Sequence, residues 1–299
     1  MEPIRLAGGG LRLTVLPIGA VVQDLRFADG ERSLVLGFAD PEAYRAGKGA
    51  VGAVVGRFAN RLRGGSFPLD GRRVEVDRNE GSNTLHGGTM GFHRRVWDVL
   101  DVGHASVTLG LVSADGDQGF PGTLRATCRY ALQDPCTVMI DLEARTDAAT
   151  VVSLAQHVYW NLDGAATIDG HDLAVRATRA LATDAEGLPT TIEPAPSLGR
   201  LTGLVVDRNF CLADRRRLEP APAASLTAGG VRLEVLTTEP GLQVYTGEHL
   251  NVAPFAPRAG LCLEAQAWPD APNRPEFPSA RLAPFEVYRQ RTVWRLARV

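Results

Sequence analysis

The chain contains 299 residues, of which 44% are hydrophobic and 22% are charged, with a formal net charge of −2 at pH 7. This composition is close to that of an average globular protein, so it excludes a disordered chain, a collagen or a coiled coil as the main architecture. Because the charge is nearly balanced, there is no strong cationic field to attract nucleic acid or anionic lipid, and we expect neither as a partner.

Short stretches of alternating apolar and polar residues follow one another along the chain, among its 32 glycines and 19 prolines. Alternation with a period of two is typical of strands with one buried face. The expected strands are, in chain order, 11–16, 73–77, 106–112, 123–130, 137–143, 171–176, 231–236, 242–245 and 288–296. The best helix start is Asp40-Pro41-Glu42, and Gly47 and Gly49 should end this helix after about two turns.

This pattern predicts an all-β protein in which antiparallel sheets are stacked as a large sandwich, with few short helices. The absence of a repeat at a fixed period weighs against a propeller. Two proline-rich stretches, 186–196 and 215–222, are expected to be surface loops, because strand-like patterns resume on both sides of each. We therefore predict a single domain over residues 1–299.

The cysteines and the apolar segments bear on the compartment. Each apolar stretch is interrupted well before the roughly 18 residues that a transmembrane helix needs, and the first residues do not resemble a signal peptide. Cys128, Cys136, Cys211 and Cys262 include no CxxC pair and lie in apolar or strand-like contexts. This favours buried, reduced thiols over disulfides or a zinc site. We expect a cytoplasmic protein.

Common cofactor and metal motifs are absent from the sequence. It lacks GxxxxGK(S/T), GxGxxG between a strand and a helix, HExxH and GxSxG, so nucleotide-dependent, zincin-type and α/β-hydrolase chemistry lack their usual parts. No two of the six histidines have the i, i+2 or i, i+4 spacing of a ligand pair on one strand or helix. A metal site assembled from distant segments stays open, but we do not expect one.

Two segments carry polar residues that could recognise a ligand. Asn60 and Arg61 lie between an apolar stretch and a glycine turn, and their amide and guanidinium groups suit vicinal hydroxyls or a carboxylate. An ordinary surface ion pair of Arg61 is an equal alternative. His86 lies among glycines that allow close backbone approach or positive φ. This segment could equally be a simple turn.

Two further segments carry groups that could transfer protons. If 154–162 is a strand, His157, Tyr159 and Asn161 share one face, although a buried histidine with a satisfied hydrogen bond is the commoner situation. In the segment 261–270, Glu264 shares a face with Gln266 and Trp268. An ionised carboxylate is costly to bury in such an apolar strand unless it is paired or used, so Glu264 is a candidate base.

A histidine and a glutamate on opposite walls of a cleft, surrounded by amides, an arginine and aromatic rings, have the composition of a sugar site. Histidine ordinarily has a pKa of about 6.5 and can act as an acid near neutral pH, and a carboxylate can accept a proton there. The expected chemistry is therefore proton transfer.

Six segments together resemble one known family, the aldose 1-epimerases or galactose mutarotases, which are β-sandwich proteins of the galactose-mutarotase-like, supersandwich type. They are GRFANR at 56–61, NTLHGG at 83–88, HVYWNLDG at 157–164, DRNF at 207–210, PGLQVYTG at 240–247 and LEAQAWPDAPNRPEFP at 263–278. The resemblance implies an isomerase that interconverts the α and β anomers of a free aldose without a cofactor.

The resemblance also implies a role for each matching residue. His157 would protonate the ring oxygen, and Glu264 would remove the proton of the anomeric hydroxyl. The sugar hydroxyls would be held by Asn60, Arg61, His86, Asp207 and Gln243, while Tyr159 would shape the pocket.

Three other functions remain open at this point. The first is a sugar-binding module of the same fold without turnover. The second is a hexose-phosphate epimerase, with cations supplied by Arg94-Arg95 or by 215–217. The third is a glycoside hydrolase that pairs Glu264 with Asp207. The stretch 189–206 is shorter than is usual in the family, which leaves the choice of sugar open.

Overall fold

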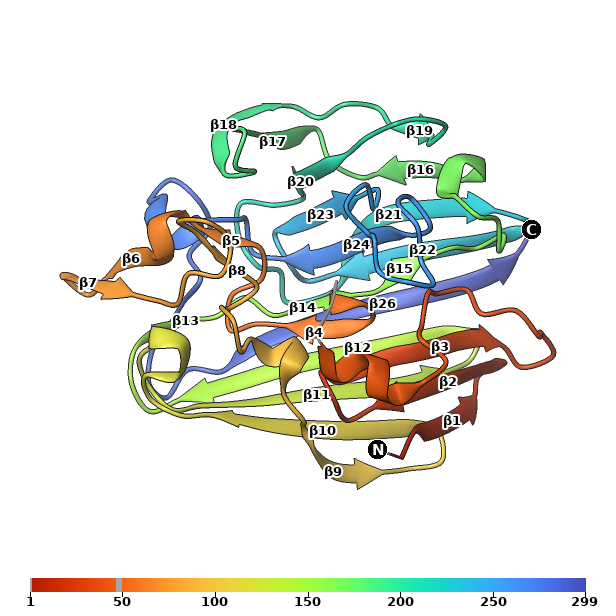
Figure 1. The fold of residues 1–299 in the computed structure, drawn as a ribbon, viewed down its shortest axis with the longest axis horizontal. Helices are drawn as coiled ribbons and strands as arrows, with labels where there is room; N and C mark the ends of the chain where they lie inside the picture. The colour runs from red at the N-terminus through yellow and green to blue at the C-terminus, as the bar shows by residue number, and fades with distance from the viewer. Residues whose placement is uncertain (1, 47–49) are drawn as a thin grey trace.

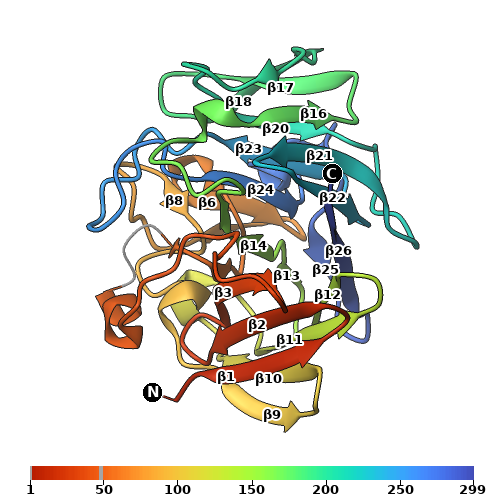
Figure 2. The same ribbon diagram turned by 90° about the vertical axis from the view of Figure 1, so that its right-hand side faces the viewer.

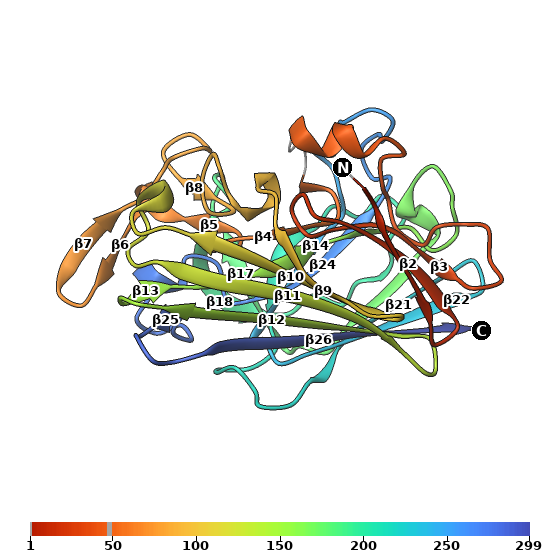
Figure 3. The same ribbon diagram turned by 90° about the horizontal axis from the view of Figure 1, so that it is seen from below.

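Antiparallel strands make up most of the computed structural model, which describes residues 2–46 and 50–299 (Figure 1). The largest sheet has nine strands. Their order is β19 (Gly199–Arg200), β16 (Asp172–Val175), β21 (Ala221–Ala228), β22 (Val231–Thr237), β26 (Tyr288–Arg298), β12 (Thr137–Thr146), β11 (Leu124–Gln133), β10 (Ser106–Ser113) and β9 (Asp98–Val102). Figure 3 shows β26, β12, β11 and β10 side by side along one face of the molecule.

A second sheet of six strands carries Tyr159, Asp207, Gln243 and Glu264. Its order is β15 (Tyr159–Trp160), β24 (Leu261–Gln266), β23 (Gly241–Tyr245), β20 (Asp207–Cys211), β17 (Arg179–Thr183) and β18 (Pro189–Pro194). Trp160 of this sheet meets Trp294 of the nine-stranded sheet edge to face, with ring centroids 4.8 Å apart. Since both rings are buried, this contact lies in a hydrophobic core between the two sheets.

Smaller sheets complete the fold. β1 (Ile4–Gly8), β2 (Leu11–Leu16) and β3 (Val21–Phe27) form a three-stranded sheet at the opposite end of the molecule from β17 and β18 (Figure 2). The two-stranded pairs are β4 (Ala53–Val55) with β14 (Ala155–His157), β5 (Arg61–Leu62) with β8 (Thr84–Leu85), β6 (Ser66–Leu69) with β7 (Arg72–Glu75), and β13 (Thr150–Val151) with β25 (Arg281–Leu282). The hairpin of β6 and β7 projects from one end of the molecule (Figures 1 and 3).

Helical structure within the described residues is confined to short 3₁₀ segments. These are η1 (Pro41–Ala46), η3 (Arg63–Gly65), η4 (Phe92–Arg94), η5 (Asp117–Gly119), η6 (Ile168–Gly170) and η7 (Ala271–Asn273). The expected helix start is confirmed by η1, where Asp40 Oδ1 accepts the backbone N–H of Glu42 at 2.9 Å. Its expected end at Gly47 and Gly49 lies outside the described residues. Among the helices described, none has the length and apolar character required to span a membrane.

The all-β sandwich and the strand positions predicted from alternation are confirmed. Two expectations were wrong. The stretch 189–194 is not a loop but the edge strand β18, where prolines are tolerated because an edge strand has backbone groups that need no partner. The segment 154–162 is not one strand, because β14 pairs with β4 whereas β15 pairs with β24.

Asn161 consequently does not join His157 and Tyr159 in a common polar wall. Its Nδ2 donates to the backbone carbonyls of Ala165 and Ala259, both at 2.8 Å, so it fastens a loop instead. The cysteines agree with the sequence prediction, since all four are free thiols and only Cys136 is partly exposed.

Candidate active site

A pocket of about 320 Å³ gathers every residue that the sequence singled out as catalytic or sugar-binding. Its size lies at the lower end of the range for small-molecule sites. The predicted residues that line it are Asn60, Arg61, His86, His157, Tyr159, Asp207, Gln243 and Glu264. They come from separate parts of the chain, so the fold, and not the sequence spacing, brings them together.

Glu264 lies on β24, the second strand from one edge of the six-stranded sheet, between β15 and β23. Both faces of β24 are buried. Leu263 and Ala265 face the hydrophobic core, and alternation directs Glu264 to the opposite face, where the pocket lies. Gln243 stands directly opposite Glu264 on β23 and therefore shares that face.

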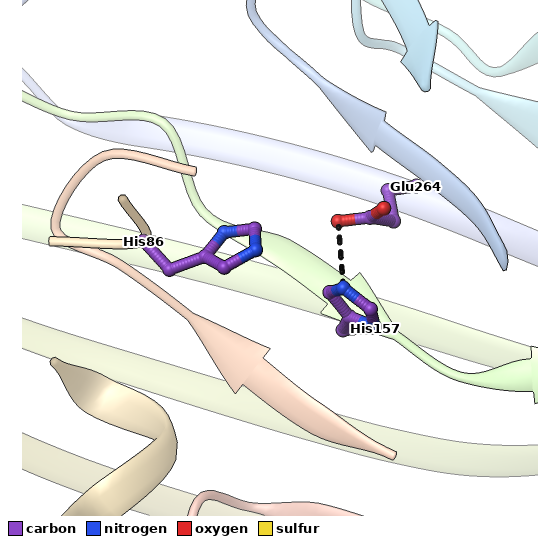
Figure 4. A group of neighbouring side chains, drawn as sticks. All are labelled: His86, His157 and Glu264. Atoms are coloured by element: carbon purple, nitrogen blue, oxygen red, sulfur yellow. Dashed lines mark ion pairs between the residues drawn. The ribbon is translucent and has the colours of Figure 1, made fainter. Parts of the chain in front are cut away.

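His157 reaches the pocket from β14, at the point where the chain passes from one small sheet to the six-stranded one. Its Nε2 lies 3.7 Å from Oε2 of Glu264, and Figure 4 shows the two side chains facing each other. Both side chains are almost fully buried, with exposed fractions of 7% and 3%. On the other side of the ring, Nδ1 lies 3.5 Å from Sγ of Cys262.

His86 completes the group drawn in Figure 4, with its ring centroid 5.3 Å from that of His157. The loop that carries it packs tightly against the backbone of Gly56, which only a glycine at position 87 allows, because a Cβ atom there would lie 2.0 Å from the carbonyl oxygen of Gly56. The backbone N–H of Asn60 donates to Nδ1 of His86 at 3.1 Å. The neutral ring therefore carries its proton on Nε2, where it is a hydrogen-bond donor.

Arg61 is fixed by a two-bond contact with Glu80. Its Nε and one terminal nitrogen donate to the two carboxylate oxygens at 2.6 and 2.8 Å. Its other terminal nitrogen lies 3.9 Å from Oδ2 of Asp207, and Oδ1 of Asp207 accepts a hydrogen bond from Gln243 Nε2 at 2.6 Å. This chain of contacts holds three predicted sugar-binding groups in place before any ligand arrives.

The pocket strongly perturbs the two central groups. Burial, together with the nearby Asp207 carboxylate and against the influence of Arg61, raises the pKa of Glu264 to about 8. Burial lowers the pKa of His157 to about 4. Between these values the two side chains hold one proton between them. This is the proton count that an acid and base working as a pair require.

His86, His157 and Glu264 place their ligand atoms within 4.8 Å of one another, which is also the composition of a metal site. The tautomer of His86 argues against that use. Its Nδ1 lone pair is occupied by the Asn60 N–H, and a protonated Nε2 cannot bind a cation. The three residues suit hydrogen bonding and proton transfer to a neutral, hydroxyl-bearing ligand better than they suit a metal ion.

Known proteins resemble this chain over nearly its whole length. A family model described as aldose 1-epimerase matches residues 3–295. The chain belongs to the aldose 1-epimerase family. A galactose mutarotase of Homo sapiens is 35% identical, with 98% of this chain and 93% of the relative covered. An aldose 1-epimerase of Escherichia coli K12 is 32% identical over 98% of this chain and 95% of the relative.

Solved structures of the aldose 1-epimerase family have the same fold. An aldose epimerase homologue from C. elegans superposes with a TM-score of 0.93 at 27% identity, covering 100% of this chain and 99% of that one. A galactose 1-epimerase from Lactobacillus acidophilus superposes with a TM-score of 0.84, also at 27% identity, covering 99% and 94%. The likeness confirms the galactose-mutarotase-like sandwich that the motifs predicted.

Several residues that line this family member's pocket were not predicted from the sequence. They are Ala50, Asn79, Glu80, Leu85, His93, Tyr245 and His249, while Arg94 was considered only as a cation for a phosphorylated sugar. Glu80 gave no signal, because it lies outside the named strands, before β8, and only the fold brings its carboxylate to Arg61. Tyr245 did give one, since it is two residues from Gln243 in an expected strand and must share its face.

Proposed function

We propose that this protein is an aldose 1-epimerase, or mutarotase, that interconverts the α and β anomers of a free monosaccharide. The 3.7 Å separation of His157 Nε2 and Glu264 Oε2 carries the proposal. Ring opening needs a base at the anomeric hydroxyl and an acid at the ring oxygen. Because both oxygens are bonded to the same carbon, the two protein groups must also lie close together.

In the proposed reaction, Glu264 removes the proton of the anomeric hydroxyl while His157 donates a proton to the ring oxygen. The bond between C1 and the ring oxygen breaks and leaves an aldehyde, a protonated Glu264 and a neutral His157. Rotation about the C1–C2 bond turns the other face of the carbonyl to the ring hydroxyl. The two proton transfers then run in reverse and close the opposite anomer, so no net proton is consumed.

The protonation states that the pocket favours match the middle of this reaction, when the sugar ring is open. A neutral His157 and a protonated Glu264, favoured by the two shifted pKa values, are the states that accompany the open-chain aldehyde. Burial thus opposes the ion pair that begins the reaction and favours the neutral pair that follows ring opening.

The remaining polar groups would hold the sugar hydroxyls. Nε2 of His86 is a donor, Arg61 offers a guanidinium, and Asp207 offers carboxylate oxygens. Asn60 Oδ1 already accepts the backbone N–H of Arg61, which leaves its amide nitrogen as a donor. Tyr159 and Tyr245, with ring centroids 6.2 Å apart, supply an aromatic wall of the kind that packs against a sugar ring.

A phosphorylated sugar is a poorer match to the pocket. Of the arginines considered for a phosphate, only Arg94 lines the pocket in the described part of the chain. Arg95 donates to Asp117, and Arg216 is paired with the buried Glu239. A single exposed guanidinium is a weak match for a dianion, which is usually bound by several donors.

The proposal is tested by polarimetry on freshly dissolved sugars. We expect purified protein to accelerate the approach of α-D-galactose or α-D-glucose to anomeric equilibrium, and to act equally on the β anomer. Glucose 6-phosphate should be a poorer substrate than glucose. Unaccelerated rates for a panel of hexoses and pentoses, with binding intact, would instead indicate a sugar-binding module, and release of reducing sugar from glycosides would indicate a hydrolase.

We further propose that residues 1–299 act as one domain in a reducing compartment such as the cytoplasm. The four free thiols support this placement, because disulfides are usual in proteins of oxidising compartments.

A further inference from the structure

Cys262 lies behind the proposed acid, on the side of the His157 ring that faces away from Glu264. Its Sγ is 3.5 Å from Nδ1 of His157, within the range of a hydrogen bond to sulfur. The thiol is fully buried, and Cys262 is not among the residues that line the pocket. It touches the reacting histidine without being in a position to touch the sugar.

The sheet fixes the position of this thiol. Cys262 stands directly opposite Tyr159 on β15 and opposite Tyr245 on β23, so these two pocket-lining tyrosines flank it on the same face of the sheet. Burial raises the pKa of the thiol well above its ordinary value, with a further contribution from Glu264. Cys262 therefore remains a neutral thiol, with a sulfur that can accept one weak hydrogen bond and a proton that it can donate elsewhere.

The reaction needs one particular tautomer of His157. As an acid the ring carries protons on both nitrogens, and after it has given up the Nε2 proton it must keep the other on Nδ1. In the opposite tautomer, Nε2 would retain a proton and could not take one back from the ring hydroxyl when the sugar closes. The partner of Nδ1 therefore decides whether the ring can act in both directions.

We propose that Cys262 is a positioning residue whose sulfur accepts the Nδ1–H of His157 and so confines the exchanged proton to Nε2. This inference rests on the proposed function. The backbone of β24 carries both Cys262 and Glu264, two residues apart on the same face. β24 thus carries both the residue that orients His157 through Nδ1 and the base, Glu264, that faces Nε2.

A thiol at this position affects the acidity of His157 differently from a carboxylate. A carboxylate at this position would stabilise the imidazolium and make it a weak acid. A thiol is a weak acceptor, so it fixes the tautomer while leaving His157 easy to deprotonate. The ether-like ring oxygen of a sugar is a very weak base, and a strong acid is what its protonation requires.

Two substitutions test this assignment by kinetics. We expect Cys262→Ala to lower kcat on the order of 10-fold, the scale typical of losing the partner of a functional histidine, with KM little changed. Cys262→Ser keeps an acceptor in the same place and should restore most of kcat. Cys128→Ala is the matched control, because Cys128 is also a fully buried thiol in a strand and does not line the pocket. It should leave kcat unchanged.

The tautomer itself is read by ¹⁵N NMR of histidine-labelled protein near pH 7, with the His157 signals assigned by their loss in His157→Gln. We expect neutral His157 to be protonated on Nδ1 in the wild type and in Cys262→Ser. In Cys262→Ala we expect both tautomers. A wild-type His157 protonated on Nε2, or a Cys262→Ala variant with unchanged kcat and tautomer, would overturn the inference. The NMR result needs no turnover, so it is separable from failure of the proposed function.

Discussion

Nε2 of His157 and Oε2 of Glu264 lie 3.7 Å apart, although β14 and β24 belong to different sheets. The chain places a potential acid and a potential base in one buried pocket, with more than a hundred residues between them in the sequence. If both transfer protons, each should be indispensable to turnover, and neither should be needed for the fold.

Removing either group should therefore abolish most of the activity. We expect His157→Gln and Glu264→Gln each to lower kcat by about 10²- to 10⁴-fold, because an amide cannot replace a positioned acid or base. Rates of anomer interconversion measured by polarimetry check this, with circular dichroism to verify folding. His104→Gln and Glu234→Gln, both at exposed positions, are the matched controls and should keep wild-type rates. Near-normal rates in both active-site variants would mean that the roles are misassigned.

The pH dependence of activity should reflect the shared proton of the pair. Below a pH of about 4 both His157 and Glu264 are protonated, so the base is lost, and above about 8 neither is, so the acid is lost. We expect kcat/KM to be nearly constant between these limits and to fall on both sides. Initial rates from pH 3.5 to 9.5, corrected for the spontaneous reaction, measure it. A single titration centred near neutral pH would contradict a coupled pair.

Much of this fold could be predicted from the sequence, because alternation with a period of two survives in strands that have one polar face. Prediction from alternation failed where both faces of a strand are buried or where the chain passes from one sheet to another. At 154–162 the turn from β14 to β15 leaves no trace in the residue pattern, since Val158 and Trp160 are apolar in either arrangement. The prolines around β18 led us to predict a loop. A strand tolerates prolines at the edge of a sheet, but which strand lies at the edge depends on the topology of the whole sheet.

The site residues were predicted from motifs, and their neighbours were not. Glu80 and Cys262 act through another side chain, Arg61 and His157 respectively, and such partners are specified only by three-dimensional contact. Spacing along the chain cannot reveal that Asn60 fixes the tautomer of His86, because the donor is a backbone N–H that any residue could supply.

Arg61 should depend on the shape of its guanidinium as well as on its charge. We expect Arg61→Lys to raise KM about 10-fold or more with a smaller effect on kcat, because an ammonium cannot make the two-bond contact with Glu80 and still reach the pocket. Arg281→Lys is the matched control, since Arg281 makes the same kind of contact with Asp70 on the surface, at 2.8 and 2.7 Å. Steady-state kinetics distinguish the two, and an unchanged KM for Arg61→Lys would exclude a role in substrate binding.

The buried carboxyl should also make the fold sensitive to pH. Between the ordinary pKa of 4.5 and the folded-state value of about 8, folded Glu264 holds a proton that the unfolded chain has lost. Its contribution to the free energy of unfolding therefore falls as the pH rises through this window, by up to about 1.4 kcal/mol per pH unit. His157 acts at the other end, because its folded-state pKa of about 4 lies below the ordinary 6.5 and stability falls as the pH drops from 6.5 towards 4.

Glu264→Gln removes the loss of stability at rising pH that comes from Glu264, and leaves the loss at falling pH that comes from His157. We expect this variant to gain stability relative to the wild type as the pH rises from 5 to 8, as measured by urea midpoints at pH 5, 6.5 and 8. Any constant cost of burying the amide cancels in the comparison across pH. Glu234→Gln, at an exposed position, should show no such trend. A stability difference that stays flat from pH 5 to 8 would mean that Glu264 is ionised in the folded protein, which would require a buried positive partner such as a protonated His157.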